Sequence, residues 1–474
     1  MNPPGLSTIA QQHLEKVREH YDRGPKLTKA AKNYRRILAQ YFNLIIPPFA
    51  SVLEVGCGSG ELLRLIRAGK RVGIDVSAEQ IALACKEIPN GEFYVQAGET
   101  VDLPGRSFDY IVISETTNLA ADVQQMFQRL RSVAHADTRL VINAYSSLWR
   151  PLIWLATRLG LRSKQPESSW LAPHDVFALL YLSDWELIRT ETRIVCPLAL
   201  FGLENLLNRF VAPLVPPLCF CFFSIARPRS APPSLRKTVS VVVPARNESG
   251  NIEAALRRTP AMGQWTEIIF AEGHSNDDTW AEIQRVKAAY PKQRIKILQQ
   301  TGKGKGNAVR EGVAVAEGEI LMILDADLTM PPEELPKFYD AIAGNRCEFA
   351  NGSRLVYPMD KQAMRFLNLC ANKTFSIIFS WLLGQPVKDT LCGTKVLTRE
   401  NYERIAANRS YFGEFDPFGD FDLLFGASKL NLKILDVPIR YKERVYGQTN
   451  IQRWRHGWLL FEMVLFAALK LKFV

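Results

Sequence analysis

Two aspartates that directly follow a run of apolar residues carry the strongest chemical signal in the sequence. Residues 320–324 are apolar, and Asp325 and Asp327 come immediately after them. Hard cations such as Mg²⁺ and Mn²⁺ bind one or two protein carboxylates and take further oxygen ligands from phosphate groups. A cation held there would neutralise the charge that grows on a diphosphate leaving group. The pair therefore predicts a metal and diphosphate site, against the alternative of two acids that merely end a strand in a turn.

A glycine-rich loop in the first half of the chain predicts a cofactor site. Gly56, Gly58 and Gly60 follow a strand-like segment, and glycine lets the backbone approach a ligand closely. A dinucleotide fingerprint would need another glycine directly after Gly60, where this chain has glutamate. Asp75 ends the next strand-like segment, and a carboxylate at that place can accept hydrogen bonds from both hydroxyls of a ribose.

Short β-branched runs alternate with segments of helical periodicity in both halves. Strands are predicted at 51–55, 71–74, 110–113 and 139–143, and again at 239–243, 267–270, 295–298 and 320–324. This alternation predicts the α/β class, with two doubly wound domains built on parallel sheets. Ligands bind such sheets outside the carboxyl ends of the strands, which is where both motifs lie.

Length and composition also predict two domains. The chain has 474 residues, whereas single hydrophobic cores rarely grow beyond about 300 residues. Residues 227–237 are rich in proline and basic residues and hold one large apolar side chain, which is typical of a linker. We therefore expect domains at 1–228 and 238–474, joined by a linker at 229–237.

The net charge of +11 is concentrated near the end of the chain, where residues 433–474 hold eight basic and three acidic side chains. Basic runs interleaved with aromatic residues, which nucleic-acid binding would favour, are not found. We therefore expect no nucleic-acid partner and attribute the excess charge to an anionic diphosphate substrate and an anionic membrane surface.

Cysteine usage and the chain ends indicate the compartment. Eight scattered cysteines without metal-binding spacing indicate reduced thiols, and the first residues contain no apolar leader. The segment 457–474 is apolar with basic flanks, yet too short and too charged to span a bilayer. We therefore expect a cytoplasmic protein with peripheral attachment to the inner face of the membrane, against the alternative that this helix only packs on the core.

Over residues 15–226 the chain resembles class I S-adenosylmethionine-dependent methyltransferases. The glycine loop, Asp75 and the segments 98–104 and 108–112 carry this resemblance. It implies the following cofactor contacts: Gly56, Gly58 and Gly60 around the methionine part with Glu54 nearby, Asp75 on the ribose, and Glu99 near the adenine amino group. The methyl acceptor is open, and His135, Tyr145 and His174 are the candidates for a base.

Over residues 237–456 the chain resembles inverting family 2 glycosyltransferases with a GT-A fold, and within them polyprenyl-phosphate mannosyl- and glucosyltransferases. Motifs at 243–248, 325–328, 351–354, 388–395, 419–424 and 437–450 carry this resemblance. It implies a nucleotide-sugar donor, with Pro244, Arg246, Glu248 and Glu272 at the nucleotide, Asp325 and Asp327 at the diphosphate and metal, Arg354, Asp389 and Lys395 at the sugar and acceptor cleft, Asp420 or Asp422 as base, and Arg444 at a phosphate.

Three readings of the whole chain follow. The leading one is a bifunctional enzyme that uses S-adenosylmethionine and a metal ion, and transfers one sugar to a lipid carrier, a lipid or a glycan. In the second, the first domain is a non-catalytic binding module beside an active glycosyltransferase. The third, a nucleotidyltransferase, is disfavoured because its glycine-rich loop would directly follow the first strand of the second domain. Glu272 in place of aspartate, and Asn450 in place of lysine, leave the nucleotide base and a phosphate acceptor open.

Overall fold

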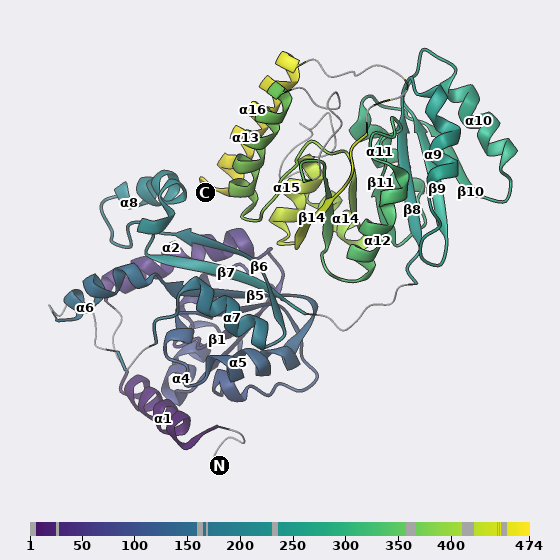
Figure 1. The fold of residues 1–474 in the computed structure, drawn as a ribbon. Coiled ribbons are helices and arrows are strands. Elements are labelled where there is room, and N and C mark those ends of the chain that lie inside the picture. Colours follow the sequence, from purple (N-terminus) through teal and green to yellow (C-terminus); the bar gives the residue numbers. More distant parts are fainter. Residues whose placement is uncertain are drawn as a thin grey trace. The chain divides into compact units, whose positions relative to one another are not determined.

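The structure is a computed structural model, and the chain divides into two compact units between residues 230 and 231 (Figure 1). It describes residues 6–24, 28–158, 165–166, 169–229, 236–356, 366–409, 421–442, 444, 446 and 453–474, without the side chains of 29, 366–372, 453–457 and 460. Most of the predicted linker and Asp420 lie outside this range. The domain limits of 228 and 238 remain a prediction.

The first unit is built on a seven-stranded sheet in the order β3-β2-β1-β4-β5-β7-β6. Its strands are β1 (Ser51–Val55), β2 (Lys70–Asp75), β3 (Glu92–Val95), β4 (Phe108–Ser114), β5 (Ala134–Tyr145), β6 (Trp185–Arg193) and β7 (Cys221–Pro228). The first five strands of this order are parallel. The expectation of a wholly parallel sheet is wrong at one edge, because β7 runs antiparallel to both β5 and β6.

Helices cover both faces of this sheet. They are α1 (Thr8–Asp22), α2 (Lys29–Ile45), α3 (Glu61–Leu65), α4 (Ala78–Glu87), α5 (Val123–Leu130), α6 (Arg150–Arg158), α7 (Pro173–Leu182) and α8 (Leu203–Leu206). Residues of α2 and α3 pack with one set of strand side chains, and residues of α5 and α7 pack with the alternate set. Both faces of the central strands are therefore buried, which explains why these strands are almost continuously apolar.

The helix after the glycine loop is shorter than predicted. The apolar pattern predicts a helix over 61–68, whereas α3 ends at Leu65 and Ile66 is extended. The Gly69 N–H donates to the Ala50 carbonyl (3.0 Å). This bond draws the chain back to the start of β1, so the helix ends before β2 begins.

The second unit is built on a seven-stranded sheet in the order β10-β9-β8-β11-β13-β12-β14. Its strands are β8 (Val239–Ala245), β9 (Thr266–Glu272), β10 (Arg294–Gln299), β11 (Ile320–Ile323), β12 (Phe349–Ser353), β13 (Lys395–Thr398) and β14 (Ile434–Pro438). Strands β8 to β11 are mutually parallel where they pair. This sheet is also mixed rather than wholly parallel, because β13 runs antiparallel to β11 and β12.

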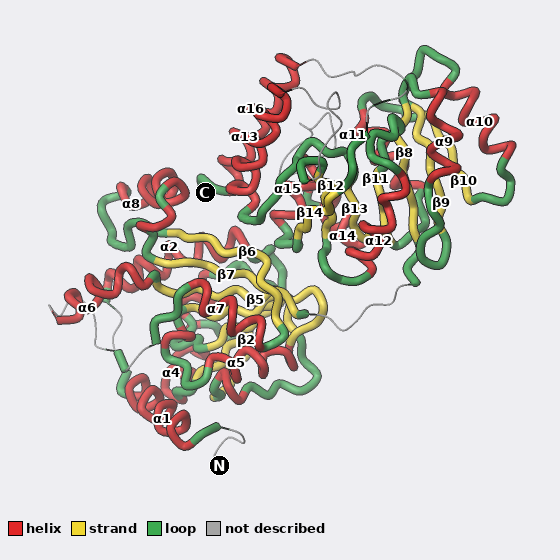
Figure 2. Tube along the Cα trace, viewed as in Figure 1, coloured by secondary structure: helices red, strands yellow, loops and turns green. Residues whose placement is uncertain are grey.

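The helices of the second unit lie along this sheet or to one side of it (Figure 2). They are α9 (Ile252–Arg258), α10 (Thr279–Ala289), α11 (Lys305–Val315), α12 (Leu335–Ala343), α13 (Phe366–Leu383), α14 (Arg399–Ala407), α15 (Phe421–Lys429) and α16 (Arg453–Leu471). The last helix, α16, lies beside α13. Within the described part of the chain, no helix is both long enough and apolar enough to cross a bilayer. The prediction of two α/β domains is confirmed.

Candidate functional site

The glycine loop lies at the carboxyl end of β1, with all three glycines in the left-handed region. Their φ angles are +73° at Gly56, +51° at Gly58 and +75° at Gly60. A Cβ at Gly56 would overlap the side chain of Thr116, whereas a Cβ at Gly58 would meet only Gln80 Oε1, 3.9 Å away. Gly56 is therefore required by packing, and Gly58 borders open space that a ligand can enter.

Asp75 is held against this loop by backbone N–H groups. Its Oδ2 accepts from the Gly58 N–H (2.8 Å), and its Oδ1 accepts from the Ser77 N–H (3.0 Å). Burial raises the pKa of the Asp75 carboxyl, and these two hydrogen bonds oppose the rise. Because β1 and β2 are parallel, Asp75 reaches the same sheet edge as the loop. The carboxylate therefore lies beside the glycine loop.

Two buried glutamates flank the loop. Glu54 is 1% exposed, and its Oε2 has no hydrogen-bond partner within the described chain. Burial raises the pKa of Glu54 to about 8, although the nearby Arg35 guanidinium opposes this. Glu99 accepts at Oε1 from the Ala121 N–H (2.7 Å) and the Asp122 N–H (3.4 Å), and burial raises its pKa. Glu99 Oε1 is therefore hydrogen-bonded to the two residues that precede α5.

The three candidate methyl-transfer bases lie in different places. His135 lies 3.3 Å from Asp109, which bonds Ser51 at the start of β1. His135 is therefore at the amino edge of the sheet, opposite the glycine loop, and that candidate is wrong. His174 is 85% exposed beside Asp175. Tyr145 ends β5 on the loop side and is buried.

In the second unit, Asp325 and Asp327 follow β11 at the edge that also holds the ends of β8 and β9. Lys305 Nζ lies 2.8 Å from Asp325 Oδ1. Burial would raise the pKa of Asp325, but Lys305, then Lys395 and Arg354, hold it below its ordinary value. Asp325 is therefore ionised at neutral pH and can face a cation or polar substrate.

Arg444 joins the second aspartate to the end of β8. Its Nη2 lies 2.6 Å from Asp327 Oδ2, and its Nη1 lies 3.0 Å from Glu248 Oε1. Asp327 Oδ1 accepts from the N–H and hydroxyl of Thr329 at 3.1 and 2.8 Å. Burial raises the pKa of Glu248, and Arg444 opposes the rise. The arrangement gathers a guanidinium and two carboxylates where a diphosphate would bind.

The predicted cleft residues form a buried polar core beside Asp325. Arg354 makes a bidentate pair with Asp389, at 2.7 and 2.9 Å, and Asp389 is fully buried. Burial would raise the pKa of Asp389, but Arg354 keeps it below its ordinary value. Lys395 is also fully buried, and its Nζ donates to the Cys392 carbonyl. These contacts join the residue that follows β12 to the residues that precede β13.

The residues predicted to bind the nucleotide differ in their exposure and in their hydrogen bonds. Pro244 is part of β8 and partly buried, and Arg246 is exposed. Glu272 is 2% exposed and accepts from the Ser275 N–H (2.5 Å) and Gln299 Nε2 (3.2 Å). Burial would raise the pKa of Glu272, but these bonds keep it low. Glu272 therefore shapes its loop, while Arg246 faces solvent.

Asp422, one of the two predicted bases, is buried on α15, and Arg409 Nε lies 2.6 Å from its Oδ2. Asp420, the other, lies outside the described residues. Their assignment as base remains a prediction.

The residues present fit the two implied groups. No three His, Cys, Asp or Glu side chains converge into a metal cage in the described part of the chain, so Asp325 and Asp327 would supply two carboxylates. Mg²⁺ suits such a site, because it keeps several waters and shares phosphate oxygens. For S-adenosylmethionine, the open space at Gly58 and the unpartnered Glu54 Oε2 provide room and an acceptor.

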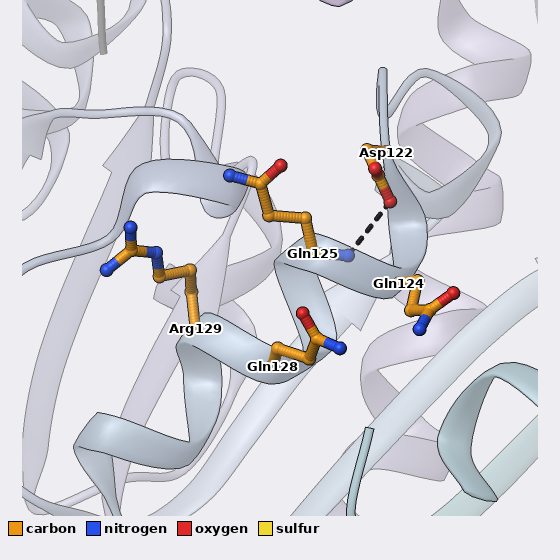
Figure 3. Close-up of a pocket in the computed structure, with 5 residues that line it drawn as sticks. All are labelled: Asp122, Gln124, Gln125, Gln128 and Arg129. Atoms are coloured by element: carbon orange, nitrogen blue, oxygen red, sulfur yellow. Dashed lines mark hydrogen bonds between the residues drawn. The ribbon is translucent and has the colours of Figure 1, made fainter. Parts of the chain in front are cut away.

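An open depression of about 530 Å³ on the surface of α5 is a separate feature (Figure 3). It is lined by Asp122, Gln124, Gln125, Gln128 and Arg129. These residues belong to one helix and its cap, where Asp122 accepts from the Gln125 N–H at 2.9 Å. The depression brings together none of the predicted site residues.

Sequence reasoning missed four residues that the structure brings to these sites. In the second unit they are Lys305, at the start of α11, and Gly393, whose Cβ would overlap both Asp325 and Lys305. In the first unit they are Glu115 and Thr116, which directly follow β4. Lys305, Glu115 and Thr116 could have been found from the sequence, because residues directly after strands and at the starts of helices border ligand sites in such sheets. Gly393 precedes β13 and carried no such signal.

Comparison with known proteins agrees with this geometry. Residues 240–405 match the family described as "Glycosyl transferase family 2", and residues 49–170 match the one described as "Methyltransferase domain". An undecaprenyl-phosphate 4-deoxy-4-formamido-L-arabinose transferase of Klebsiella pneumoniae is 33% identical over 239 residues, which are 48% of this chain and 67% of that protein. The chain therefore belongs to glycosyl transferase family 2 and carries a methyltransferase domain ahead of that region.

Two further relatives were compared. A dolichol-phosphate mannosyltransferase of Pyrococcus furiosus is 29% identical over 222 residues, which are 45% of this chain and 59% of that protein. The chain thus spans little more than half the length of this relative. A glucosyl-3-phosphoglycerate synthase of Mycobacterium tuberculosis, solved with Mn²⁺ and uridine diphosphate, is 19% identical with a TM-score of 0.37, and covers 50% of this chain and 80% of that one.

Replacement of Glu54 by glutamine should stabilise the first unit at alkaline pH. The pKa of Glu54 is about 8 in the folded chain, against an ordinary value of 4.5. Folding therefore takes up a proton between about pH 4.5 and pH 8, and stability falls as the pH rises through that window. The melting temperature of Glu54→Gln should match wild type near pH 5 and exceed it increasingly towards pH 8. Glu87→Gln, an exposed control on α4, should show no such trend, and a difference independent of pH would contradict the prediction.

Replacement of Gly393 by alanine should impair the second site. The added Cβ would overlap the Asp325 carboxylate and the Lys305 ammonium, and a displacement of about 1 Å at a reacting group can cost roughly 10²-fold in rate. We expect kcat/KM for sugar transfer to fall by about this factor, with S-adenosylhomocysteine binding by the first unit unchanged in calorimetry. If Gly393→Ala keeps the wild-type turnover, the loop can move without affecting sugar transfer and the prediction is wrong.

Proposed function

We propose that this protein is a bifunctional enzyme. Its second unit transfers one sugar from a nucleotide-sugar donor, with inversion and with a divalent cation, to a polyprenyl-phosphate or other lipid-linked or glycan acceptor. Its first unit transfers a methyl group from S-adenosylmethionine. The observation that carries the sugar-transfer proposal is the convergence of Asp325, Asp327, Glu248, Lys305 and Arg444 at one sheet edge. The acceptor class is supported by the relatives that act on dolichol phosphate and undecaprenyl phosphate.

The charges at this edge suit departure of a nucleoside diphosphate. A bound Mg²⁺ or Mn²⁺ supplies positive charge to the leaving diphosphate. Arg444 and Lys305 add fixed positive charge within 2.8 Å of the two aspartates, and charge-assisted bonds from such groups are about twice as strong as neutral ones. Arg354 and Asp389 hold the neighbouring loop so that these groups keep their positions.

The methyltransferase proposal rests on the glycine loop. Gly58 faces open space, and Asp75 is fixed beside it by the Gly58 and Ser77 N–H groups. The alternative of a non-catalytic binding module predicts cofactor binding without turnover. Transfer of radiolabel from S-adenosylmethionine to any acceptor would decide between the two.

Sugar transfer should require a divalent cation and Asp327. Asp327→Asn removes the charge that orders Arg444 and would hold the cation, so turnover should fall by about 10²–10³-fold. EDTA should abolish release of nucleoside diphosphate from the wild type, and added Mg²⁺ or Mn²⁺ should restore it. Asp340→Asn, an exposed control on α12, should behave as wild type. Full turnover in excess chelator would exclude the metal from the reaction.

We also propose peripheral attachment of the second unit to the inner face of a membrane through α16. The helix has two apolar faces. Met463, Ala467 and Ala468 are buried, whereas an exposed stripe is formed by Trp458, Phe461, Leu465 and Leu469 at 64%, 53%, 52% and 44% exposure. The exposed residues recur every three or four positions and so lie on one side of the helix. With Lys470 beside them, they suit the interface of an anionic bilayer.

Flotation with anionic vesicles tests this attachment. The double variant Trp458→Ser, Leu465→Ser should lose most of the vesicle-bound fraction, because it removes apolar area from the exposed stripe without touching the buried face. Val315→Ser, an exposed apolar control on α11, should float like wild type. If wild type and the double variant float equally, α16 does not provide the attachment.

A further inference from the structure

Several buried polar atoms of the first unit lack a nitrogen or oxygen partner among the described residues, and two of them lie near each other. They are the hydroxyl of Tyr34, on α2, and Oε1 of Glu115, directly after β4. Burial raises the pKa of Tyr34, and the Cys221 thiol and the Glu115 carboxylate beside it raise it further. Buried polar groups are usually bonded. Glu115 Oε1 has no partner among the described residues, and the Tyr34 hydroxyl has only the weakly bonding Cys221 thiol beside it, so both atoms could bond a ligand.

Glu115 lies directly against the glycine loop. Strand β4 pairs with β1 so that Ile113 is opposite Val55, and the Thr116 hydroxyl donates to the Val55 carbonyl (2.9 Å). Glu115 itself has a φ of +62°, and its N–H donates to the Asn143 carbonyl (2.9 Å). A left-handed conformation is unfavourable for glutamate. The fold holds Glu115 in this conformation in spite of this cost, with its carboxylate near Tyr34, Arg35 and Cys221.

Aromatic rings pack against one another next to these two atoms. The Tyr145 ring stacks on Tyr34 with centroids 6.2 Å apart, and contacts Phe220 at 5.1 Å and Trp170 at 6.0 Å. Tyr34 also meets Phe220 edge to face at 5.4 Å. Helix α2 covers this region from one face of the sheet (Figure 1). Small-molecule sites commonly combine such aromatic walls with a few polar groups.

The charged groups around Glu115 determine which charge a ligand can carry at this place. Burial would lower the pKa of Arg35, on α2, but the carboxylates of Glu115, Glu54 and Glu61 raise it. Arg35 Nε lies 3.8 Å from the Glu61 carboxylate. Tyr34, Tyr145 and Cys221 are the other titratable groups near the carboxylate. A cation beside the carboxylate disfavours an ammonium ligand. A neutral group that donates a hydrogen bond, such as a hydroxyl, fits both orphan oxygens.

We propose that Tyr34, Glu115, Tyr145 and Trp170 form the methyl-acceptor site and that the acceptor is a sugar hydroxyl whose proton Glu115 takes. The aromatic faces suit the apolar C–H face of a sugar ring, and the polar atoms suit its hydroxyls. This inference rests on the proposed methyltransferase function. The second unit of the same chain, as proposed, handles glycosyl groups, so a glycosylated product is a chemically consistent acceptor.

The proposed methyl transfer is a simple displacement at the methyl carbon. The hydroxyl oxygen attacks the methyl carbon of S-adenosylmethionine and forms a carbon–oxygen bond. The carbon–sulfur bond breaks, its electron pair stays on sulfur, and S-adenosylhomocysteine leaves. The hydroxyl proton passes to the Glu115 carboxylate and from there to solvent. Tyr34 orients the hydroxyl, and general-base assistance of this kind contributes about 10²–10⁴-fold.

Two measurements on the full-length protein test the site. Saturation-transfer difference NMR with methyl hexosides, in the presence of S-adenosylhomocysteine, reports contact between sugar C–H groups and the aromatic walls. Radiolabel transfer from S-adenosylmethionine to the same hexosides reports turnover. Trp170→Ala should weaken the NMR effect and raise KM more than it lowers kcat. Glu115→Gln should lower kcat by about 10²-fold or more, with S-adenosylhomocysteine affinity unchanged.

Each outcome decides a separate claim. Trp154→Ala, an exposed tryptophan on α6, and Glu87→Gln on α4 are matched controls and should behave as wild type. If S-adenosylhomocysteine fails to bind the wild type, the methyltransferase function fails and the acceptor site with it. If it binds but hexosides show no saturation transfer, or if folded Glu115→Gln keeps the wild-type rate, only the acceptor-site inference is overturned.

Discussion

Parallel strand pairing is the constraint on which both sites depend, because it brings the carboxyl ends of neighbouring strands to one sheet edge. In the first unit, β1 pairs in parallel with β2 and β4, so the glycine loop, Asp75 and Glu115 meet. In the second, β8 pairs in parallel with β9 and β11, so the loops that follow these strands also meet. Residues far apart in the chain thereby share one site without any long connecting structure.

The two units stabilise their buried carboxylates in different ways, and this difference matches the ligands proposed for them. In the first unit, backbone N–H groups bond Asp75 and Glu99, and burial leaves the pKa values of these carboxyls raised. In the second, Lys305 and Arg354 pair with Asp325 and Asp389 and keep their pKa values low. A site with fixed cations suits an anionic diphosphate, whereas a site lined mainly by carboxyl groups suits a sulfonium cofactor.

Close packing against glycine sets the position of the reacting groups in both units. At Gly56 the absent Cβ leaves room for Thr116, which holds the segment with Glu115 against β1. At Gly393 the absent Cβ leaves room for the Asp325 and Lys305 pair. In each case the glycine belongs to one strand-end loop and the functional side chain to another. The packing therefore couples two loops that the chain does not connect directly.

Local pattern alone determined the strands and the residues that follow them. The run 51–55 was predicted with the bounds that β1 has. Asp75, Asp325 and Asp327 were predicted as candidate site residues because each follows a short apolar run, and such a pattern involves only a few neighbouring residues. The tertiary structure decided what depends on distant partners. Arg444 meets Asp327 across 117 residues, Arg354 pairs with Asp389, β7 and β13 reverse direction, and His135 lies at the wrong edge. These depend on how the sheets pair and pack, because long-range contacts leave no periodicity in the sequence.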